Sequence, residues 1–334
     1  MPLSTPLTRD AGIEVPLICG AMYPCSNPEL VAAVSEAGGI GVVQPISLTY
    51  VHGHEFRAGL RYIRSLTSRP IGMNALIEQS SRTYRERMGK WVDGALEEGV
   101  RFFITSLGNP RWVAERAHAA GGVVYHDVTE RKWAQKAVDA GVDGVICVND
   151  RAGGHAGGRG AEELLAEVAD LGLPAVCAGG VGDERDFVAA LRMGYAGVQM
   201  GTRFIATAEC RTTDAYKQAI VDSGEDDIVL SERITGVPVA VIRTPYIEKM
   251  GLRVGPVARW MFRGRKTKHW MRSFYALRSL WQLKRASLGE VSTEYWQAGK
   301  SVAGIDSVEA AGEIVRRFAR AAVEDAMATR RADR

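Results

Sequence analysis

Eight short apolar runs alternate with longer amphipathic stretches through the first two thirds of this sequence. The runs are rich in valine and isoleucine and are bounded by glycine or proline, as is typical of strands buried on both faces. Eight strands alternating with helices predict an α/β fold, the closed (β/α)8 or TIM barrel. The runs are Pro16–Ala21, Ile40–Val43, Ile71–Asn74, Phe102–Thr105, Val123–His126, Gly144–Val148, Ala175–Ala178 and Gly197–Met200.

Helix signals fill the stretches between these runs. Asn27 and Pro28 have the residue types of an N-cap and a first-turn proline. Several candidates end on glycine, which suits a left-handed C-cap. The expected helices are Glu29–Ala37, Arg82–Glu98, Trp112–Ala120, Arg131–Ala140, Glu162–Leu171, Glu184–Met193 and, near the C-terminus, Ser307–Ala328. The alternative, a doubly wound open sheet, usually carries an early glycine-rich turn. Ala21-Met22-Tyr23-Pro24 is not such a turn, so the barrel is favoured.

The composition changes after about Leu230, which divides the expected barrel, residues 1–230, from a helical segment, residues 231–334, within one structural domain. Lys249–Gly289 contains lysine, arginine and aromatic residues but no Asp or Glu. We expect the basic, aromatic-rich part, Arg259–Arg285, to form a helical cap over the barrel mouth, with its cations facing water. Attraction of an anionic substrate or cofactor, anionic-lipid binding and nucleic-acid binding are the alternatives.

Charge, hydropathy and cysteine usage exclude several classes of protein. The net charge of +3 is too small to imply nucleic-acid binding, and no stretch is apolar for long enough to span a bilayer. Met1–Asp10 lacks the pattern of a secretory signal. Five cysteines without paired spacing argue against a disulfide framework and a zinc cluster. We therefore expect a cytoplasmic protein with no metal site and no membrane association, and homo-oligomerisation stays open.

The strongest candidate for chemistry is the glycine-rich stretch Asn149–Gly158, which directly follows the sixth run. In such barrels the loops after the strands form the active face. Gly153 and Gly154 allow the backbone to approach a flat ligand closely. His155, between glycines, is left unshielded, and its ordinary pKa suits proton transfer near neutrality. We expect His155 to be catalytic.

Two further glycine sites follow the last two runs. Gly179 and Gly180 come after the seventh run, and Gly201 and Thr202 come after the eighth. Loops at these two positions often bind phosphate through backbone N–H groups. We expect these four residues to bind a phosphate-bearing cofactor.

Polar residues at other strand ends are candidates for the pocket wall. Asn74 ends the third run, where its amide can hydrogen-bond a ring edge, and Gln44 and Gln199 lie at similar depths. His126 and Asp127 follow the fifth run and either line the pocket or pair with each other. Nothing near Cys25 activates it as a nucleophile.

Together these motifs resemble the nitronate monooxygenase family, also called 2-nitropropane dioxygenase-like, over roughly Pro16–Ala206. The same His-containing glycine loop occurs in NADH:quinone reductases and in a flavin-dependent enoyl-acyl-carrier-protein reductase. The motifs are Pro16-Leu-Ile-Cys-Gly-Ala-Met22, Asn27-Pro-Glu-Leu30, Ala37-Gly-Gly-Ile-Gly41, Gly72-Met-Asn74, Ala152-Gly-Gly-His-Ala-Gly157, Ala178-Gly-Gly180 and Met200-Gly-Thr-Arg-Phe204.

The resemblance implies FMN as cofactor and His155 as the catalytic residue. It assigns the FMN contacts to Ala21, Met22, Asn74, Gly179, Gly180, Gly201 and Thr202. The sequence departs from the pattern at Asp127, where some relatives carry lysine, and in Arg259–Arg285.

The implied activity is FMN-dependent oxidation of alkyl nitronates, with O2, to carbonyl compounds. The alternative is an NAD(P)H-dependent FMN reductase that acts on a quinone or an enoyl thioester. From another class, a non-catalytic protein that binds FMN or a lipid surface is the third reading.

Overall fold

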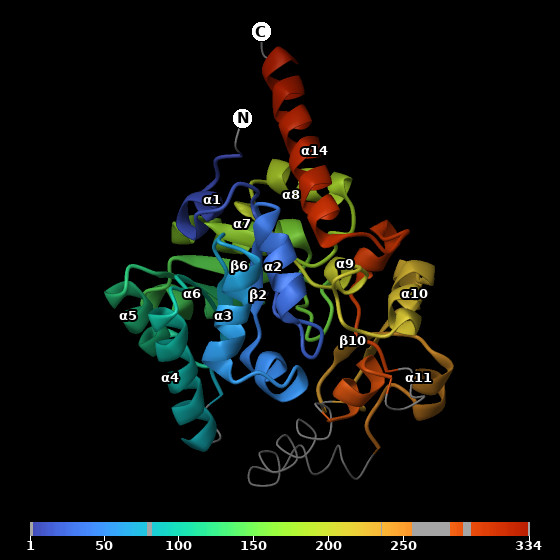
Figure 1. Cartoon of the computed structure of the whole chain (residues 1–334). Coiled ribbons are helices and arrows are strands. Elements are labelled where there is room, and N and C mark those ends of the chain that lie inside the picture. The colour runs from blue at the N-terminus through green and yellow to red at the C-terminus, as the bar shows by residue number, and fades with distance from the viewer. Residues whose placement is uncertain (1–2, 79–81, 235, 256–280, 290–294, 333–334) are drawn as a thin grey trace.

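The chain forms a closed barrel of eight parallel strands in a computed structural model that describes residues 3–78, 82–234, 236–255, 281–289 and 295–332 (Figure 1). Strand β8 pairs with β1 from Leu17 opposite Val198 to Cys19 opposite Met200, which closes the ring. The strands are β1 Leu17–Cys19, β2 Ile40–Val43, β3 Gly72–Leu76, β4 Phe102–Ser106, β5 Val123–Val128, β6 Gly144–Val148, β7 Ala175–Ala178 and β8 Gly197–Met200. The predicted fold class is confirmed.

Helices cover the outside of the barrel. They are α1 Pro6–Ala11, α2 Pro28–Glu36, α3 Phe56–Leu66, α4 Arg82–Glu97, α5 Arg111–Ala119, α6 Arg131–Asp139, α7 Ala161–Val168, α8 Glu184–Met193, α9 Thr202–Ile205, α10 Asp214–Asp222, α11 Pro245–Met250 and α14 Ala311–Ala332. Single turns are η1 Ser47–Val51, η2 Ala169–Leu171, η3 Glu225–Asp227 and η4 Lys300–Gly304. The sequence prediction missed α3, although buried Phe56, Leu60 and Ile63 recur at helical spacing.

Two helix-end predictions have different outcomes. Gly172 and Gly194 have φ values of 73° and 107°, so these helices do end on left-handed glycines. Asn27 occupies the N-cap position of α2 with Pro28 behind it, but its side chain makes no cap hydrogen bond. Instead its Nδ2 donates to Glu209 O (2.9 Å) and its Oδ1 accepts from Arg211 N (3.0 Å). Asn27 therefore joins the β1 loop to the chain beyond β8.

The strand side chains form two cores because alternate residues face opposite sides of each strand. Inward residues, such as Ile18, Ile104 and Ile146, fill the barrel itself. Outward residues, such as Phe103 and Val145, pack with the helices in a larger cluster. The barrel is therefore a packed core, and ligands can reach only its ends.

Helix α1 closes the end of the barrel at which the strands begin. Leu7 is fully buried and lies against Gly197 at the start of β8. Tyr125, which is fully buried in the barrel, donates its hydroxyl to Asp10 Oδ2 at 2.8 Å. The open end is consequently the one where the strands finish.

The sequence analysis expected the second segment to be helical, but this segment also contains strands. Strands β9 (Ile228–Ser231) and β10 (Val239–Ile242) form an antiparallel pair, and β9 spans the expected boundary at residue 230. They share a small apolar cluster with Ile247 and Leu283. Each strand has only four residues, too few for periodicity to separate strand from helix. Figure 1 shows β10 and α11 at the end of the barrel opposite the projecting α14.

Most of the expected cap, Arg259–Arg285, lies outside the described residues. In its described part, residues 281–287 are helical. Lys284 Nζ donates to Tyr50 O (3.0 Å), which joins this helix to the β2–α3 connection. Packing of the whole segment over the mouth stays a prediction.

A buried arginine fixes the C-terminal segment to the barrel. Arg203, on α9, is 1% exposed, and its Nη2 donates to Ala206 O (2.9 Å) and Ser307 O (2.7 Å). Its Nη1 lies 3.5 Å from Glu309 Oε1. Arg317 also bonds Glu309, so loss of Arg203 leaves the two carbonyls, rather than the carboxylate, without their donor.

We therefore predict that Arg203→Met lowers the free energy of unfolding by about 3 kcal/mol. The control is Arg316→Met, which removes an exposed ion pair with Glu313 and should leave the stability close to that of the wild type. Urea unfolding of both variants measures the difference. Equal losses would contradict the anchoring role of Arg203.

Candidate functional site

The loop after β6 is tied to the β7 loop by Asn149, which is fully buried. Its Nδ2 donates to Gly179 O (3.0 Å), and its Oδ1 accepts from Arg151 N (2.9 Å). Its backbone O accepts from Gly157 N (3.1 Å), which brings the far side of the loop back to the strand end. The sequence analysis assigned Asn149 no role. Its place directly after a buried strand was the available signal.

His155 stands at the apex of this loop. Ala156 N donates to Gly154 O (3.0 Å), a tight turn around the histidine. Gly154, with φ of 69°, adopts the left-handed conformation that the turn requires. The imidazole is exposed, and the atoms around it lower its pKa by desolvation. His155 is therefore neutral at neutral pH, and the ring can accept a proton.

The two glycines after β7 serve loop packing. A Cβ on Gly179 would lie 2.6 Å from Ala152 N and would also meet Asn149. A Cβ on Gly180 would lie 2.7 Å from Nε of Arg151, whose guanidinium pairs with Glu225. Both have positive φ values. Their side-chain directions are thus filled by the β6 loop, and their backbone is what remains to meet a ligand.

Gly201, by contrast, faces open space. Among the described residues, a Cβ there would have only Met22 within 4 Å, at 3.4 Å from Sδ. Met22 and the half-buried Ala21 follow β1, beside β8 in the ring. The structure thus brings the predicted residues Ala21, Met22 and Gly201 together on one side of the mouth.

The C-terminal segment completes the site through Gly299, which the sequence analysis missed. Gly299 N donates to Thr202 Oγ1 (3.0 Å), and a Cβ on Gly153 would lie 2.9 Å from Gly299 N. Strand β10 adds a contact, because Ala240 N donates to Gly154 O (2.8 Å). The His155 loop is therefore clamped between the β8 turn and residues from the second segment. Gly299 lies far from any barrel motif, so no local pattern pointed to it.

Polar side chains occupy inward positions near the ends of several strands, on the side of the mouth. Asn74 on β3 is half-buried, and its amide forms no hydrogen bond within the described part of the chain. Asp127 Oδ1 on β5 and Gln199 Oε1 on β8 are buried without a partner among the described residues. Gln44 differs, because its Oε1 accepts from Ser47 N (2.7 Å) and so caps a turn. Asn74, Asp127 and Gln199 have hydrogen-bonding capacity left for a ligand.

His126 and Asp127 lie on opposite faces of β5. The two side chains therefore do not pair with each other, and they do not both line the pocket, because successive residues of a strand face opposite sides. His126 is 5% exposed on the helix side, where Nδ1 shares a hydrogen bond with Thr105 Oγ1 (2.8 Å). Burial lowers the pKa of His126 to about 4. His126 is therefore a neutral core residue, and Asp127 alone faces the bore.

The described residues do not indicate a reactive thiol, a metal site or a membrane-spanning helix. All five cysteines are free and buried, and burial raises the pKa of Cys147 and Cys177 to about 12. Within the described ranges, no group of three or more His, Cys, Asp or Glu side chains could hold a metal ion. No helix in that part of the chain has the length and apolarity needed to cross a membrane.

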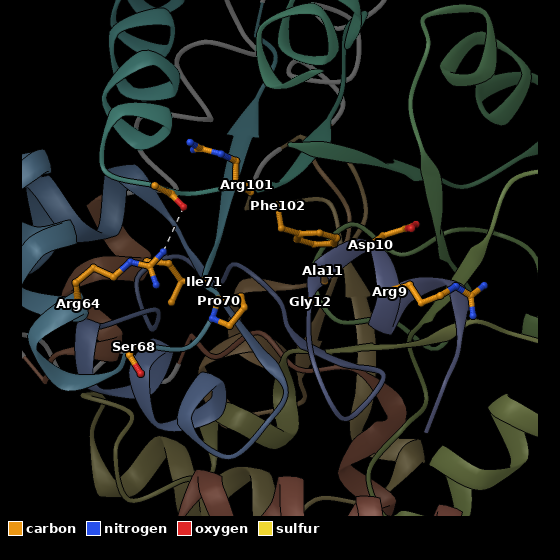
Figure 2. A pocket seen from close by; sticks show the side chains of 11 residues that line it. Arg9, Asp10, Ala11, Gly12, Arg64, Ser68, Pro70, Ile71, Arg101 and Phe102 are labelled. Atoms are coloured by element: carbon orange, nitrogen blue, oxygen red, sulfur yellow. Dashed lines mark hydrogen bonds between the residues drawn. The ribbon is translucent and has the colours of Figure 1, made fainter. Parts of the chain in front are cut away.

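A hollow of about 350 Å³ lies at the other end of the barrel, where α1 ends and β4 begins (Figure 2). Arg9, Arg64, Arg101 and Phe102 contribute to its lining. Arg64 donates to Gly99 O (3.4 Å), as the dashed line shows, so its guanidinium group already has a hydrogen-bond partner in the wall of the hollow. This hollow is remote from the β6, β7 and β8 loops, and we assign the chemistry to the mouth.

The arrangement at the mouth has a defined chemical capacity. Glycine backbones allow a flat ligand to approach, and unpartnered amide and carboxyl groups can bind its polar edges. A neutral imidazole at the mouth can accept a proton from a second molecule or bind its negative charge.

Comparisons with known proteins agree with this geometry. Residues 4–319 match the family described as nitronate monooxygenase. The chain is 34% identical over 254 residues, 75% of this chain and 69% of the relative, to the (3aS,4S,5R,7aS)-5-hydroxy-7a-methyl-1-oxo-octahydro-1H-indene-4-carboxyl-CoA dehydrogenase of Mycobacterium tuberculosis. It is 30% identical over 293 residues, 75% of this chain and 81% of the relative, to a protein of Staphylococcus saprophyticus named "Probable nitronate monooxygenase".

Among solved structures, FabK from Thermotoga maritima superposes with a TM-score of 0.79 at 27% identity. The superposition covers 98% of this chain and 99% of FabK. The similarity therefore extends beyond the barrel into the second segment.

The buried imidazole of His126 gives a pH prediction. Its folded-state pKa lies below the ordinary value of 6.5, so the unfolded chain binds the proton first and stability falls as the pH falls below 6.5. Between pH 7 and pH 5 this group should cost about 2 kcal/mol. In His126→Leu, Thr105 keeps its hydrogen bond to Tyr125 O, and this part of the acid sensitivity should vanish. Denaturant unfolding at both pH values is the measurement, and an unchanged pH dependence would refute the assignment.

Proposed function

The chain belongs to the nitronate monooxygenase family, and on that premise we propose that this oxidoreductase uses FMN and O2 to convert alkyl nitronates to carbonyl compounds. The observation that carries the proposal is His155, raised on a tight glycine turn at the barrel mouth, in a chain matched to the family over residues 4–319. FMN, when bound, would supply the electron transfer to and from substrate and oxygen.

The residues at the mouth fit such a cofactor. Gly201 leaves the space of a side chain open beside Met22. The Asn74 amide has unused donors and an acceptor, which suits the polar edge of a flavin ring. We assign FMN contacts to these residues and to Ala21, Gly153, Gly154, Gly179, Gly180 and Thr202.

His155 has two tasks in this proposal. Its lowered pKa keeps the ring neutral, so one nitrogen donates a hydrogen bond to the anionic nitro group while the other accepts. With a nitroalkane, which still carries its α-proton, the second nitrogen can take that proton and leave the nitronate bound. Nothing in the described chain competes for the imidazole, because it forms no hydrogen bond there.

A second candidate is an FMN-dependent oxidoreductase that acts on a coenzyme A thioester, either oxidising it with electrons passed to the flavin or reducing it with electrons from NAD(P)H. It is favoured by the 34% identity to a carboxyl-CoA dehydrogenase, which exceeds the 30% identity to the named nitronate monooxygenase. Lys249–Gly289, which has cations and no acid, has the charge that suits the phosphates of coenzyme A.

Anaerobic reduction of the purified yellow protein separates these candidates. The flavin absorbance is followed after addition of an alkyl nitronate, of NADH or NADPH, or of an acyl-CoA. Bleaching by the nitronate, with carbonyl product on admission of O2, supports the first proposal. Bleaching only by a nicotinamide or an acyl-CoA would replace it with the second.

The cytoplasmic location and the absence of nucleic-acid and membrane partners stay predictions, and homo-oligomerisation stays open.

For His155→Ala we predict retained FMN and a loss of turnover of about 10²–10⁴-fold, the usual contribution of a general acid–base group. Flavin content and the rate of anaerobic reduction are measured on the same preparation. The control is His118→Ala, since His118 is exposed and pairs only with Asp143 in the described chain. Full activity of His155→Ala with bound FMN would remove this residue from the mechanism.

For Gly201→Ala we predict at least a tenfold loss of FMN affinity without loss of stability. The added methyl would occupy space that FMN needs, and the φ of −112° is one that alanine adopts readily. Gly160→Ala is the matched control, because its Cβ would meet nothing within 4 Å and its φ is −66°. Fluorescence titration of the apoproteins with FMN gives both affinities. Equal affinities would move the cofactor away from Gly201.

A further inference from the structure

Asp127 lies where the bore of the barrel opens into the mouth. Along β5, Val123 and Tyr125 face the barrel core, and the alternation of the strand turns Asp127 to the same side. Its carboxylate accepts a hydrogen bond from Gln199 of β8, three strands further round the ring. The two side chains therefore meet across the bore.

Gln199 is held in a fixed position by the chain around it. A Cβ on Gly20, just after β1, would lie 2.9 Å from Gln199 Cγ, so the glutamine packs flat against this glycine. The Gln199 amide and the Asp127 carboxyl group thus lie side by side under the mouth, and we call this pair the polar floor.

This floor is incomplete by itself. Asp127 Oδ1 and Gln199 Oε1 are buried, and neither has a hydrogen-bond partner within the described ranges. A buried polar atom without a partner destabilises the folded state, so native proteins rarely retain one without a function or a ligand. The two atoms point to a group that enters the mouth and bonds them.

We propose that Asp127 binds the flavin ring as a neutral carboxylic acid, with the Gln199 amide donating to one carboxyl oxygen and the single acid proton donated to the ring. The inference rests on the proposed function. A neutral donor at the ring favours reduction, since reduction adds negative charge to the ring. A carboxylate there would oppose it by repulsion.

The surroundings of Asp127 favour the neutral acid. Burial raises the pKa of Asp127 to about 7, and the hydrogen bond from Gln199 offsets part of that rise. The inward residues of the adjoining strands carry no charge: they are Ile104 and Ser106 on β4 and Ile146 and Val148 on β6. His126 faces the other side of β5. The charged form of Asp127 thus has no cation among these neighbours.

The test uses the holoenzyme and the variants Asp127→Asn and Asp127→Ala. Asparagine retains a hydrogen-bond donor but cannot ionise. We measure FMN content, the FMN dissociation constant and the midpoint potential of the bound flavin as functions of pH. The control is Asp150→Asn, in the neighbouring loop, where the aspartate is exposed.

In the wild type, the potential should fall more steeply with pH once Asp127 ionises, and FMN binding should weaken over the same range. Asp127→Asn should lose this additional pH dependence, and Asp127→Ala should bind FMN about tenfold more weakly at pH 6. Asp150→Asn should behave as the wild type. A purely structural role would not alter the pH dependence of the potential.

Identical potential–pH curves for wild type and Asp127→Asn, both with FMN bound, would overturn the inference and leave the proposed function intact. A wild-type protein that neither carries nor takes up FMN would overturn both. If Asp127→Ala does not fold, the asparagine variant still decides, because it preserves the shape of the side chain.

Discussion

The pairing of β8 with β1 is the constraint on which the rest of this structure depends. Closure makes the interior a packed core, so each strand must place apolar residues inward along most of its length. An inward polar group has to reach one end of the barrel, because only there can a ligand, solvent or a covering helix bond it; Tyr125 does so at the closed end through Asp10. Asn74, Asp127 and Gln199 lie near the open end. The same closure also places the β8 turn beside Met22 of the β1 loop, although the two are far apart in the sequence.

The local patterns were sufficient for the barrel but not for the parts that join it to the second segment. Eight buried strands leave strong apolar runs, and each run was placed correctly. Strands β9 and β10 have four residues each, and their apolar residues resemble those of any short buried segment. The role of Gly299 depends on its contact with Gly153 and Thr202, and no property of the residues around it reports that contact. Local sequence patterns are therefore enough to predict the barrel. The contact of Gly299 with the His155 loop depends on the tertiary fold, so local patterns do not predict it.

Strand alternation also explains why two neighbouring titratable residues of β5 lie in different surroundings. His126 and Asp127 are adjacent, yet one is packed under the helices and the other faces the mouth. Burial disfavours the charge of both, which lowers the pKa of the histidine and raises that of the aspartate. Their effects on stability between about pH 4 and pH 7 therefore have opposite signs and partly cancel. A flat overall pH profile would conceal two sizeable contributions, and single variants are needed to see either one.

The contact between Gly153 and Gly299 has a consequence for biosynthesis. Chains emerge from the ribosome N-terminus first, and structure can form as they do. All eight strands have been made by Met200, but the segment that closes over the His155 loop follows almost a hundred residues later. A nascent barrel can therefore collapse around its core while the mouth is still uncovered. The contacts at that mouth are then completed late, after most of the chain has left the ribosome.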